Sequence, residues 1–72
     1  MSTLNARQQE ILSYIIADKR AKGYPPTLRE IADAVGLSSV SCVLAHLYKL
    51  EEMGYIRREP STPRGLTVLR EA

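Results

Sequence analysis

The sequence predicts a mainly α-helical domain in which three helices are followed by a two-stranded antiparallel β-hairpin. Two short stretches, residues 27–35 and 39–50, each start with a capping residue and carry apolar residues at helical spacing, and Gly36 separates them. A longer amphipathic stretch precedes this helix pair. Two short alternating stretches follow it, and residues 60–63 between them have the composition of a turn.

The length and composition favour one small globular domain. We expect residues 1–72 to form a single domain, since a chain of 72 residues can build only one small core. A charged fraction of 25% and a hydrophobic fraction of 44% are typical of globular proteins. No apolar run approaches the roughly 18 residues that a membrane span needs, and the N-terminus lacks a signal-peptide pattern. We therefore expect a cytoplasmic protein without a membrane partner.

The chain has one cysteine, Cys42, and one histidine, His46. A single cysteine excludes an internal disulfide and any metal site built from several cysteines. The two side chains lie four residues apart on one predicted helix, so they could pair as nucleophile and base or as two metal ligands. No third orienting group or ligand lies near them in the sequence. We therefore expect no enzyme, no metal or cofactor site and no small-molecule substrate.

The net charge of +2 says little about a partner, but its distribution along the chain says more. The last sixteen residues contain four arginines and two acids, namely Arg57, Arg58, Arg64 and Arg70 with Glu59 and Glu71. A basic segment of this kind suits a polyanion such as DNA, and a solvated charged surface is the alternative interpretation.

The first helix is predicted to begin after Asn5 and to stop at Gly23. Asn5 and Gln8 have the spacing of a capping box, and glycine is common in the left-handed position that ends a helix. Its buried stripe consists of Ile11, Leu12, Ile15 and Ile16. Residues 1–4 are expected to be a frayed end. We interpret residues 24–26, Tyr-Pro-Pro, as a stiff connector, and a proline-rich recognition ligand is the less favoured alternative.

The second and third helices are separated by a tight turn. Thr27 and Glu30 have capping-box spacing at the start of the second helix, and Ser38 or Ser39 can cap the third. The apolar residues of the third helix fall on one side and are expected to face the core: Val40, Val43, Leu47 and Leu50. Small, polar or basic residues occupy the opposite side: Ser39, Ser41, Cys42, Ala45 and Lys49, with Leu44 and Tyr48 toward its edges.

The outward side of the third helix predicts a contact with DNA. A helix that enters the major groove needs small side chains for close approach and hydroxyl groups that can bond to bases or phosphates. Ser39, Ser41 and Ala45 meet this description, and Leu44 could contact a thymine methyl group. A solvent-exposed helix front is the alternative, but such surfaces are usually richer in Glu and Lys, whereas charge is scarce here before Lys49.

Residues 55–59 and 65–69 are expected to pair as the two strands of the hairpin. Ile56 would turn inward, since a two-stranded ribbon is marginally stable alone and must pack on the helices. Arg64 would then lie near the tip, where it can meet a phosphate or a minor groove.

Several short motifs occur in the order found in one protein family: Asn5-Ala6-Arg7-Gln8-Gln9-Glu10, Gly23-Tyr24-Pro25-Pro26-Thr27 with Glu30-Ile31-Ala32, Gly36-Leu37-Ser38-Ser39, His46-Leu47 with Leu50, and Pro63-Arg64-Gly65. Together they resemble the N-terminal DNA-binding domain of the LexA repressor family over essentially the whole chain. The resemblance implies a winged helix-turn-helix fold, with a recognition helix at about residues 39–52 and a wing at residues 57–68. It places Arg7 at a position that contacts the DNA backbone and Arg64 in the wing.

By position, the base-reading residues of the family correspond to Ser41, Leu44 and Ala45, with Ser39 beside them. Lys49, on the same side of the helix, completes the predicted DNA-binding set. The best-known enterobacterial pattern has an amide and two acidic residues where Ser41, Leu44 and Ala45 stand here, so we expect a different operator sequence. The serine-rich start of the helix is more similar to versions from Gram-positive bacteria.

The resemblance also implies repression of transcription through operator binding, typically of genes of the DNA-damage (SOS) response, by homodimers on two-fold related half-sites. In this family the C-terminal half carries a serine–lysine self-cleavage site and most of the dimer interface. The chain stops at Ala72 before either, so we expect no protease and either an excised domain or a short natural relative. A winged helix that binds another protein instead of DNA is the alternative function, and Cys42 or Tyr48 at an apolar surface would be its signature.

Overall fold

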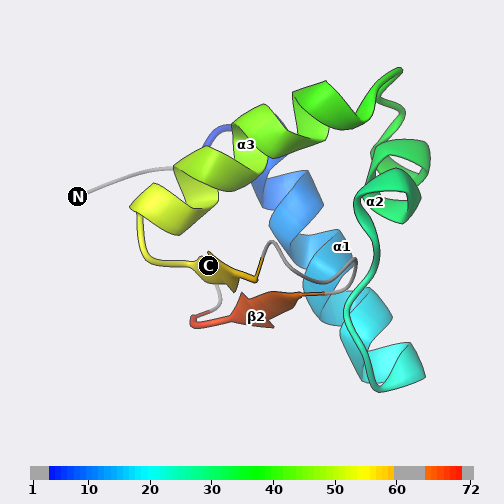
Figure 1. Ribbon diagram of the computed structural model, residues 1–72, viewed down its shortest axis with the longest axis vertical. Helices are drawn as coiled ribbons and strands as arrows, with labels where there is room; N and C mark the ends of the chain where they lie inside the picture. Colours follow the sequence, from blue (N-terminus) through cyan, green and yellow to red (C-terminus); the bar gives the residue numbers. More distant parts are fainter. Residues whose placement is uncertain (1–3, 60–64, 71–72) are drawn as a thin grey trace.

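The computed structural model describes residues 4–59 and 65–70, and within them it contains three helices and two strands (Figure 1). These elements are α1 (Ala6–Lys22), α2 (Leu28–Val35), α3 (Val40–Glu52), β1 (Ile56–Arg58) and β2 (Leu66–Val68). The two strands pair antiparallel. The predicted fold class, a mainly α-helical winged helix with a small antiparallel hairpin, is confirmed.

Reciprocal side-chain caps fix the starts of α1 and α2. The side-chain oxygen of Asn5 accepts a hydrogen bond from the Gln8 backbone N–H at 2.8 Å, and the Gln8 side chain accepts one from the Asn5 N–H at 3.1 Å. Thr27 and Glu30 make the same pair of bonds at 3.2 Å and 2.8 Å. Both predicted capping boxes are confirmed, and they satisfy backbone donors that have no partner within the helix.

The pair α2 and α3 forms the helix-turn-helix. Gly36 ends α2 with a φ of 75°, in the left-handed region that other residues rarely adopt. The Leu37 N–H then donates to the Ala32 carbonyl at 2.9 Å, so the turn is closed by the last part of α2. In the part of the chain that the structure describes, no single helix is long and apolar enough to cross a membrane, and α2 with α3 would pass that test only as a pair bent by 99°.

A small polar cluster ties the end of α1 to the start of α2. Lys22 Nζ lies 3.3 Å from Asp18 Oδ1 and 3.8 Å from Glu30 Oε2. The hydrogen bond to Asp18 raises the pKa of Lys22. Burial raises the pKa of Tyr14, and the charge of Asp18 acts in the same direction. These contacts link the end of α1 to the start of α2.

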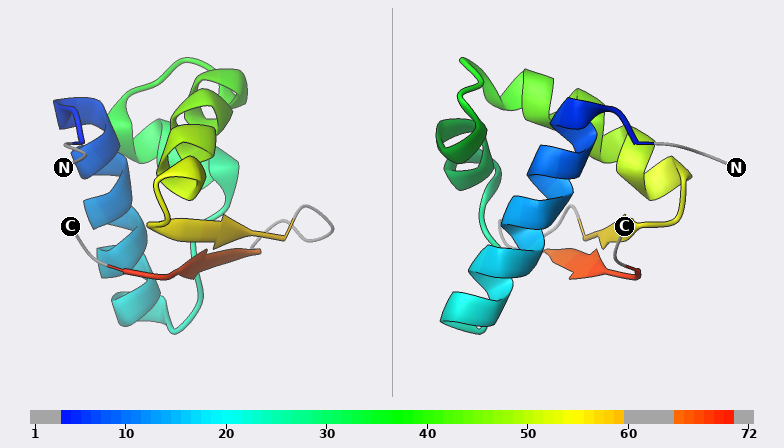
Figure 2. Two further views of the ribbon diagram at one scale, coloured as in Figure 1. Left: turned by 90° about the vertical axis from the view of Figure 1, so that its left-hand side faces the viewer. Right: turned by 180° about the vertical axis from the view of Figure 1, so that it is seen from behind.

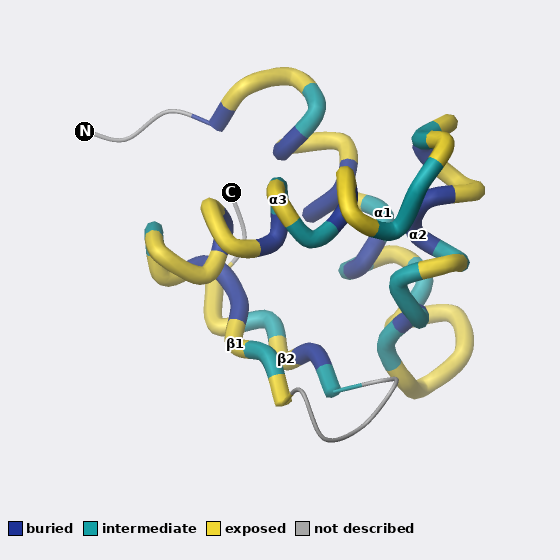
Figure 3. The backbone as a smooth tube through the Cα atoms, turned by 45° about the horizontal axis from the view of Figure 1, so that its top comes forward, coloured by how far each residue is buried: buried dark blue, intermediate teal, exposed yellow. Residues whose placement is uncertain are grey.

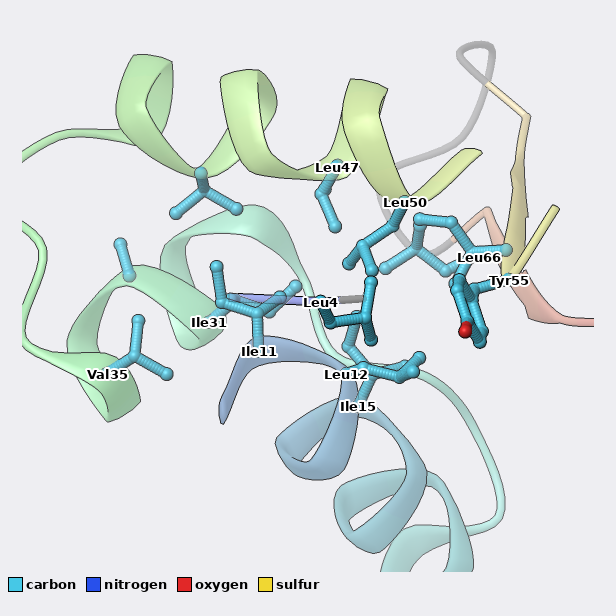
Figure 4. Packing of buried hydrophobic residues seen from close by; sticks show 13 residues of the cluster. Leu4, Ile11, Leu12, Ile15, Ile31, Val35, Leu47, Leu50, Tyr55 and Leu66 are labelled. Carbon is cyan, nitrogen blue, oxygen red and sulfur yellow. The ribbon is translucent and has the colours of Figure 1, made fainter. Parts of the chain in front are cut away.

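Within the described residues, a hydrophobic cluster joins all five elements (Figure 4). Its members are Leu4, Ile11, Leu12, Ile15, Ile31, Ala32, Val35, Val43, Leu47, Leu50, Tyr55, Ile56 and Leu66. α3 contributes Val43, Leu47 and Leu50, each with 0% of its surface exposed. Because these three side chains share one side of the helix, the opposite side of α3 is turned away from the core.

Two predictions about burial were wrong. Leu4 is not part of a frayed end: its side chain belongs to the core, and its carbonyl accepts a hydrogen bond from the Gln9 side chain at 3.2 Å. An apolar residue directly before a helix cap can pack against the helix and so fix the entering chain. Val40 is half-buried and outside the core cluster, because it is the first residue of α3 and lies at the end of that helix.

The hairpin lies beside the C-terminal end of α3 (Figure 2). Its register pairs Ile56 with Val68, Arg57 with Thr67 and Arg58 with Leu66. Ile56 is 1% exposed and Leu66 is 8% exposed, so one side of the hairpin packs into the core, as predicted for Ile56. Residues 60–64 lie between the strands, and Arg64, predicted near the tip, is therefore outside the described residues.

Candidate nucleic-acid interface

The outward side of α3 is open to solvent along the helix (Figure 3). Its exposed residues are Ser41, Cys42, Ala45, Tyr48 and Lys49, and Leu44 is half-buried. With 3.6 residues per turn, Ser41, Ala45 and Tyr48 follow one another in a single stripe. The structure thus brings the three residues predicted to read bases, Ser41, Leu44 and Ala45, together on the surface of one helix.

Ser39 has a structural role at the start of α3. Its Oγ accepts a hydrogen bond from the Cys42 backbone N–H at 3.4 Å, which makes it the N-cap among the two serines considered. The same hydroxyl donates to Cys42 Sγ at 3.4 Å. Because the Ser39 hydroxyl is engaged in the cap and half-buried, Ser41 is the more accessible serine on this side.

Lys49 lies near the opposite end of the outward side. Its Nζ is 3.5 Å from Glu52 Oε1, and the two side chains are 64% and 73% exposed. Such an exposed ion pair contributes about 0–1 kcal/mol to stability. A phosphate could therefore replace the carboxylate of Glu52 at little cost to the fold.

Arg7 connects α1 with the end of α2. Its Nη1 donates a hydrogen bond to the Val35 carbonyl, one of the last carbonyls of α2, and lies 3.3 Å from Glu10 Oε1. The Arg7 side chain is 40% exposed. The residue predicted to contact the DNA backbone therefore also binds the end of the helix that precedes α3, and part of its side chain remains exposed.

Arg58 is a further basic residue beside α3, and the sequence analysis did not place it there. Its Cζ lies 4.9 Å from the centroid of the Tyr48 ring, and its backbone N–H donates to Glu51 Oε2 at 3.5 Å. The sequence placed Tyr48 toward the edge of the outward side of the helix. It gave no signal for the partner on β1, because that pairing depends on where the hairpin docks.

Cys42 and His46, the pair considered above as a catalytic or metal site, both lie on α3. Among the described residues, no group of three His, Cys, Asp or Glu side chains could hold a metal ion. Cys42 is exposed, and Ser39 is its hydrogen-bond partner. An open hollow of about 510 Å³ lies elsewhere, between α1 and β2, and is lined by Ile16, Lys19, Arg20, Gly23, Val68, Leu69 and Arg70.

The family model described as the LexA DNA binding domain matches residues 1–65 of this chain. The chain belongs to this family. The chain is 61% identical over 69 residues to the LexA repressor of Halalkalibacterium halodurans and 56% identical over 69 residues to that of Shouchella clausii. It is 52% identical over 69 residues to the LexA repressor of Geobacillus thermodenitrificans, and each of the three alignments covers 96% of this chain.

These alignments cover 33% of each LexA repressor, so the chain spans about one third of the length of the relatives it matches. The aligned part includes the helix-turn-helix, and the family match runs through Gly65, just before β2. The predicted resemblance to the LexA DNA-binding domain is therefore confirmed.

Proposed function

We propose that this domain binds double-stranded DNA sequence-specifically, with α3 in the major groove. The observation that carries the proposal is the outward side of α3 in a chain of the LexA DNA-binding family: it is largely exposed, begins with small side chains and has no acidic residue from Ser41 to Lys49. A helix with small side chains at its N-terminal end can approach base edges closely.

In this arrangement Ser41, Leu44 and Ala45 meet base edges, the serine through its hydroxyl and the other two through apolar contact, for example with a thymine methyl group. Lys49 meets a phosphate at the far end of the helix. Ser39 lies at the same end of α3 as Ser41, and its side chain caps the first turn of the helix.

Two arginines complete the proposed interface. Arg7 would offer its exposed edge to the DNA backbone, and Arg64 would reach a phosphate or the minor groove from the wing. Contacts of this type fix the position of the helix on the duplex and make binding depend on salt, but they carry little sequence information.

We further propose that the domain acts as the DNA-binding part of a LexA-like transcriptional repressor. The relatives at 52–61% identity are named LexA repressors, and they come from bacteria. The repressor would act in the cytoplasm, and it would bind operators of the DNA-damage response as a homodimer on two-fold related half-sites. Residues 1–72 would form one domain of it, without enzymatic activity. An isolated domain should bind one half-site weakly, because linking two sites raises the apparent affinity.

The test is selection of bound duplexes from a randomised DNA library, followed by titration of the enriched duplex at several salt concentrations. We expect one half-site motif to be enriched and log K to fall linearly with log salt. Ser41→Ala should change the preferred bases, whereas Arg64→Gln should weaken binding to all sequences similarly. No enrichment and a flat salt response would instead indicate a protein-binding winged helix.

A further inference from the structure

Tyr48 and Arg58 form a pair that joins α3 to β1 on the side proposed to face DNA. The guanidinium of Arg58 lies over the ring of Tyr48, with 4.9 Å between Cζ and the ring centroid. Tyr48 is 57% exposed, and it continues the stripe of Ser41 and Ala45 by one further turn. The charge of Arg58 is therefore held at the border between the recognition helix and the hairpin.

The neighbouring cations are paired with carboxylates, and Arg58 differs from them. Lys49 Nζ lies 3.5 Å from Glu52, and Arg57 Nη2 lies 3.4 Å from Glu59. Among residues 4–59 and 65–70, the Arg58 side chain makes no ion pair, and its buried Nη1 has no hydrogen-bond acceptor. Because Arg58 has no ion pair with a carboxylate, it does not have to break one in order to bind another anion.

From this geometry, and resting on the function proposed above, we propose that Arg58 binds a DNA phosphate at the junction of helix and wing and that Tyr48 positions it. A guanidinium that lies over an aromatic ring can still offer N–H groups at its edge to a phosphate. Because Nη1 of Arg58 is buried, the phosphate is assigned to the other N–H groups, those of Nε and Nη2. The ring also restricts the side chain before DNA binds, so less conformational entropy is lost on binding.

This role differs from that of the base-reading residues. A phosphate contact from the start of the wing fixes how far α3 enters the groove and at which angle, since phosphate contacts set the register of a protein on the duplex. Tyr48 is a positioning residue in this proposal, because its effect on DNA passes through Arg58.

The experiment measures the affinity for the selected half-site duplex as a function of salt for the intact chain and its variants. Arg58→Gln should lower the affinity roughly tenfold and reduce the slope of log K against log salt by about 0.9, the value for one phosphate contact. Arg57→Gln is the matched control, since it removes a charge from the adjacent residue of the same strand, and should change the slope by much less. Arg58→Lys should keep most of the slope and lose affinity, because lysine lacks the planar fork.

Three Tyr48 variants separate positioning from a merely structural role. Tyr48→Phe keeps the ring and should bind like the unmodified chain, whereas Tyr48→Leu should weaken binding. In the Arg58→Gln background, Tyr48→Leu should have no further effect, because the two residues act through one contact. Circular dichroism melting of each variant verifies that the domain is folded; Arg58→Lys serves as the test if Arg58→Gln does not fold.

The outcomes distinguish this inference from the proposed function. If the unmodified chain enriches no duplex, the proposed function fails. If it binds with a normal salt slope and Arg58→Gln behaves like Arg57→Gln, DNA binding stands and the Arg58 contact is overturned. If Tyr48→Leu binds as tightly as the unmodified chain while Arg58→Gln does not, the positioning role of Tyr48 is overturned.

Discussion

Replacing Arg7 tests whether this arginine stabilises the helix-turn-helix, contacts DNA, or does both. In the structure its Nη1 bonds to the Val35 carbonyl at the end of α2 and also meets Glu10 within α1. The substitution Arg7→Met removes both interactions while keeping an unbranched stem and a similar helix propensity. Its effect on stability therefore measures the two polar contacts of the guanidinium.

We expect Arg7→Met to lower the free energy of unfolding by about 1.5 kcal/mol. A hydrogen bond to a charged group contributes roughly 1.5–3 kcal/mol when buried, and we take about 1 kcal/mol for the Val35 bond because the Arg7 side chain is 40% exposed and water can replace part of it. The pair with Glu10 has i,i+3 spacing, and such exposed pairs contribute about 0.2–0.5 kcal/mol. Glu10→Gln removes only this smaller interaction, so it should cost at most about 0.5 kcal/mol.

Urea unfolding followed by far-ultraviolet circular dichroism gives both free energies. Equal losses for Arg7→Met and Glu10→Gln would refute the reasoning, because they would mean that the bond to Val35 contributes nothing. DNA titration of the same variants gives the second answer. If Arg7 also contacts a phosphate, the salt slope of Arg7→Met should fall by about 0.9, whereas Glu10→Gln should not reduce it.

Four further substitutions test the core, the turn, the cap and the outward side of α3. Leu47→Ala should cost about 2–5 kcal/mol, since the side chain is 0% exposed, and circular dichroism should find a largely unfolded chain at room temperature. Gly36→Ala should lower the free energy of unfolding in urea by about 1 kcal/mol, the cost of placing alanine in the left-handed conformation. Because an added Cβ meets no atom within 4 Å, a loss above roughly 3 kcal/mol would contradict this purely conformational explanation. Ser39→Ala should lose about 1 kcal/mol of stability as a removed cap, whereas Ser41→Ala should lose less than about 0.5 kcal/mol and instead alter the bases selected from a random library. The opposite ranking of the two serines would mean that Ser41, and not Ser39, supports the helix.

Local sequence signals predicted most of the fold because they are short-range. A capping box joins residues three apart, such as Asn5 and Gln8. A glycine in the left-handed conformation, such as Gly36, ends a helix without needing a distant partner. Apart from Val40, the buried side of α3 also followed from spacing alone. These features give the helices their bounds and the outward direction of Ser41.

Contacts between distant segments could not be predicted in this way. The bond from Arg7 to Val35 joins residues 28 positions apart, and the stacking of Arg58 on Tyr48 requires the docked hairpin. Leu4 was interpreted as part of a chain end, although an apolar residue directly before a cap is a local sign of packing, because the core that it enters is built from several elements. In each case the partner lies on another element, so the side chain acquires its role only when the elements pack.

The positions of the charges separate affinity from specificity in the proposed complex. Along α3, Lys49 is the one lysine or arginine, and it is paired with Glu52, while the stripe from Ser41 to Tyr48 is uncharged. The helix can therefore discriminate bases through contact but can supply little of the salt-dependent attraction. That attraction must come from residues beside the helix, and Arg58 is well placed for it because Tyr48 holds its charge against α3. It follows that changes at Ser41, Leu44 or Ala45 should alter the preferred sequence at nearly constant salt slope, whereas changes at Arg58 should lower the slope at nearly constant sequence preference.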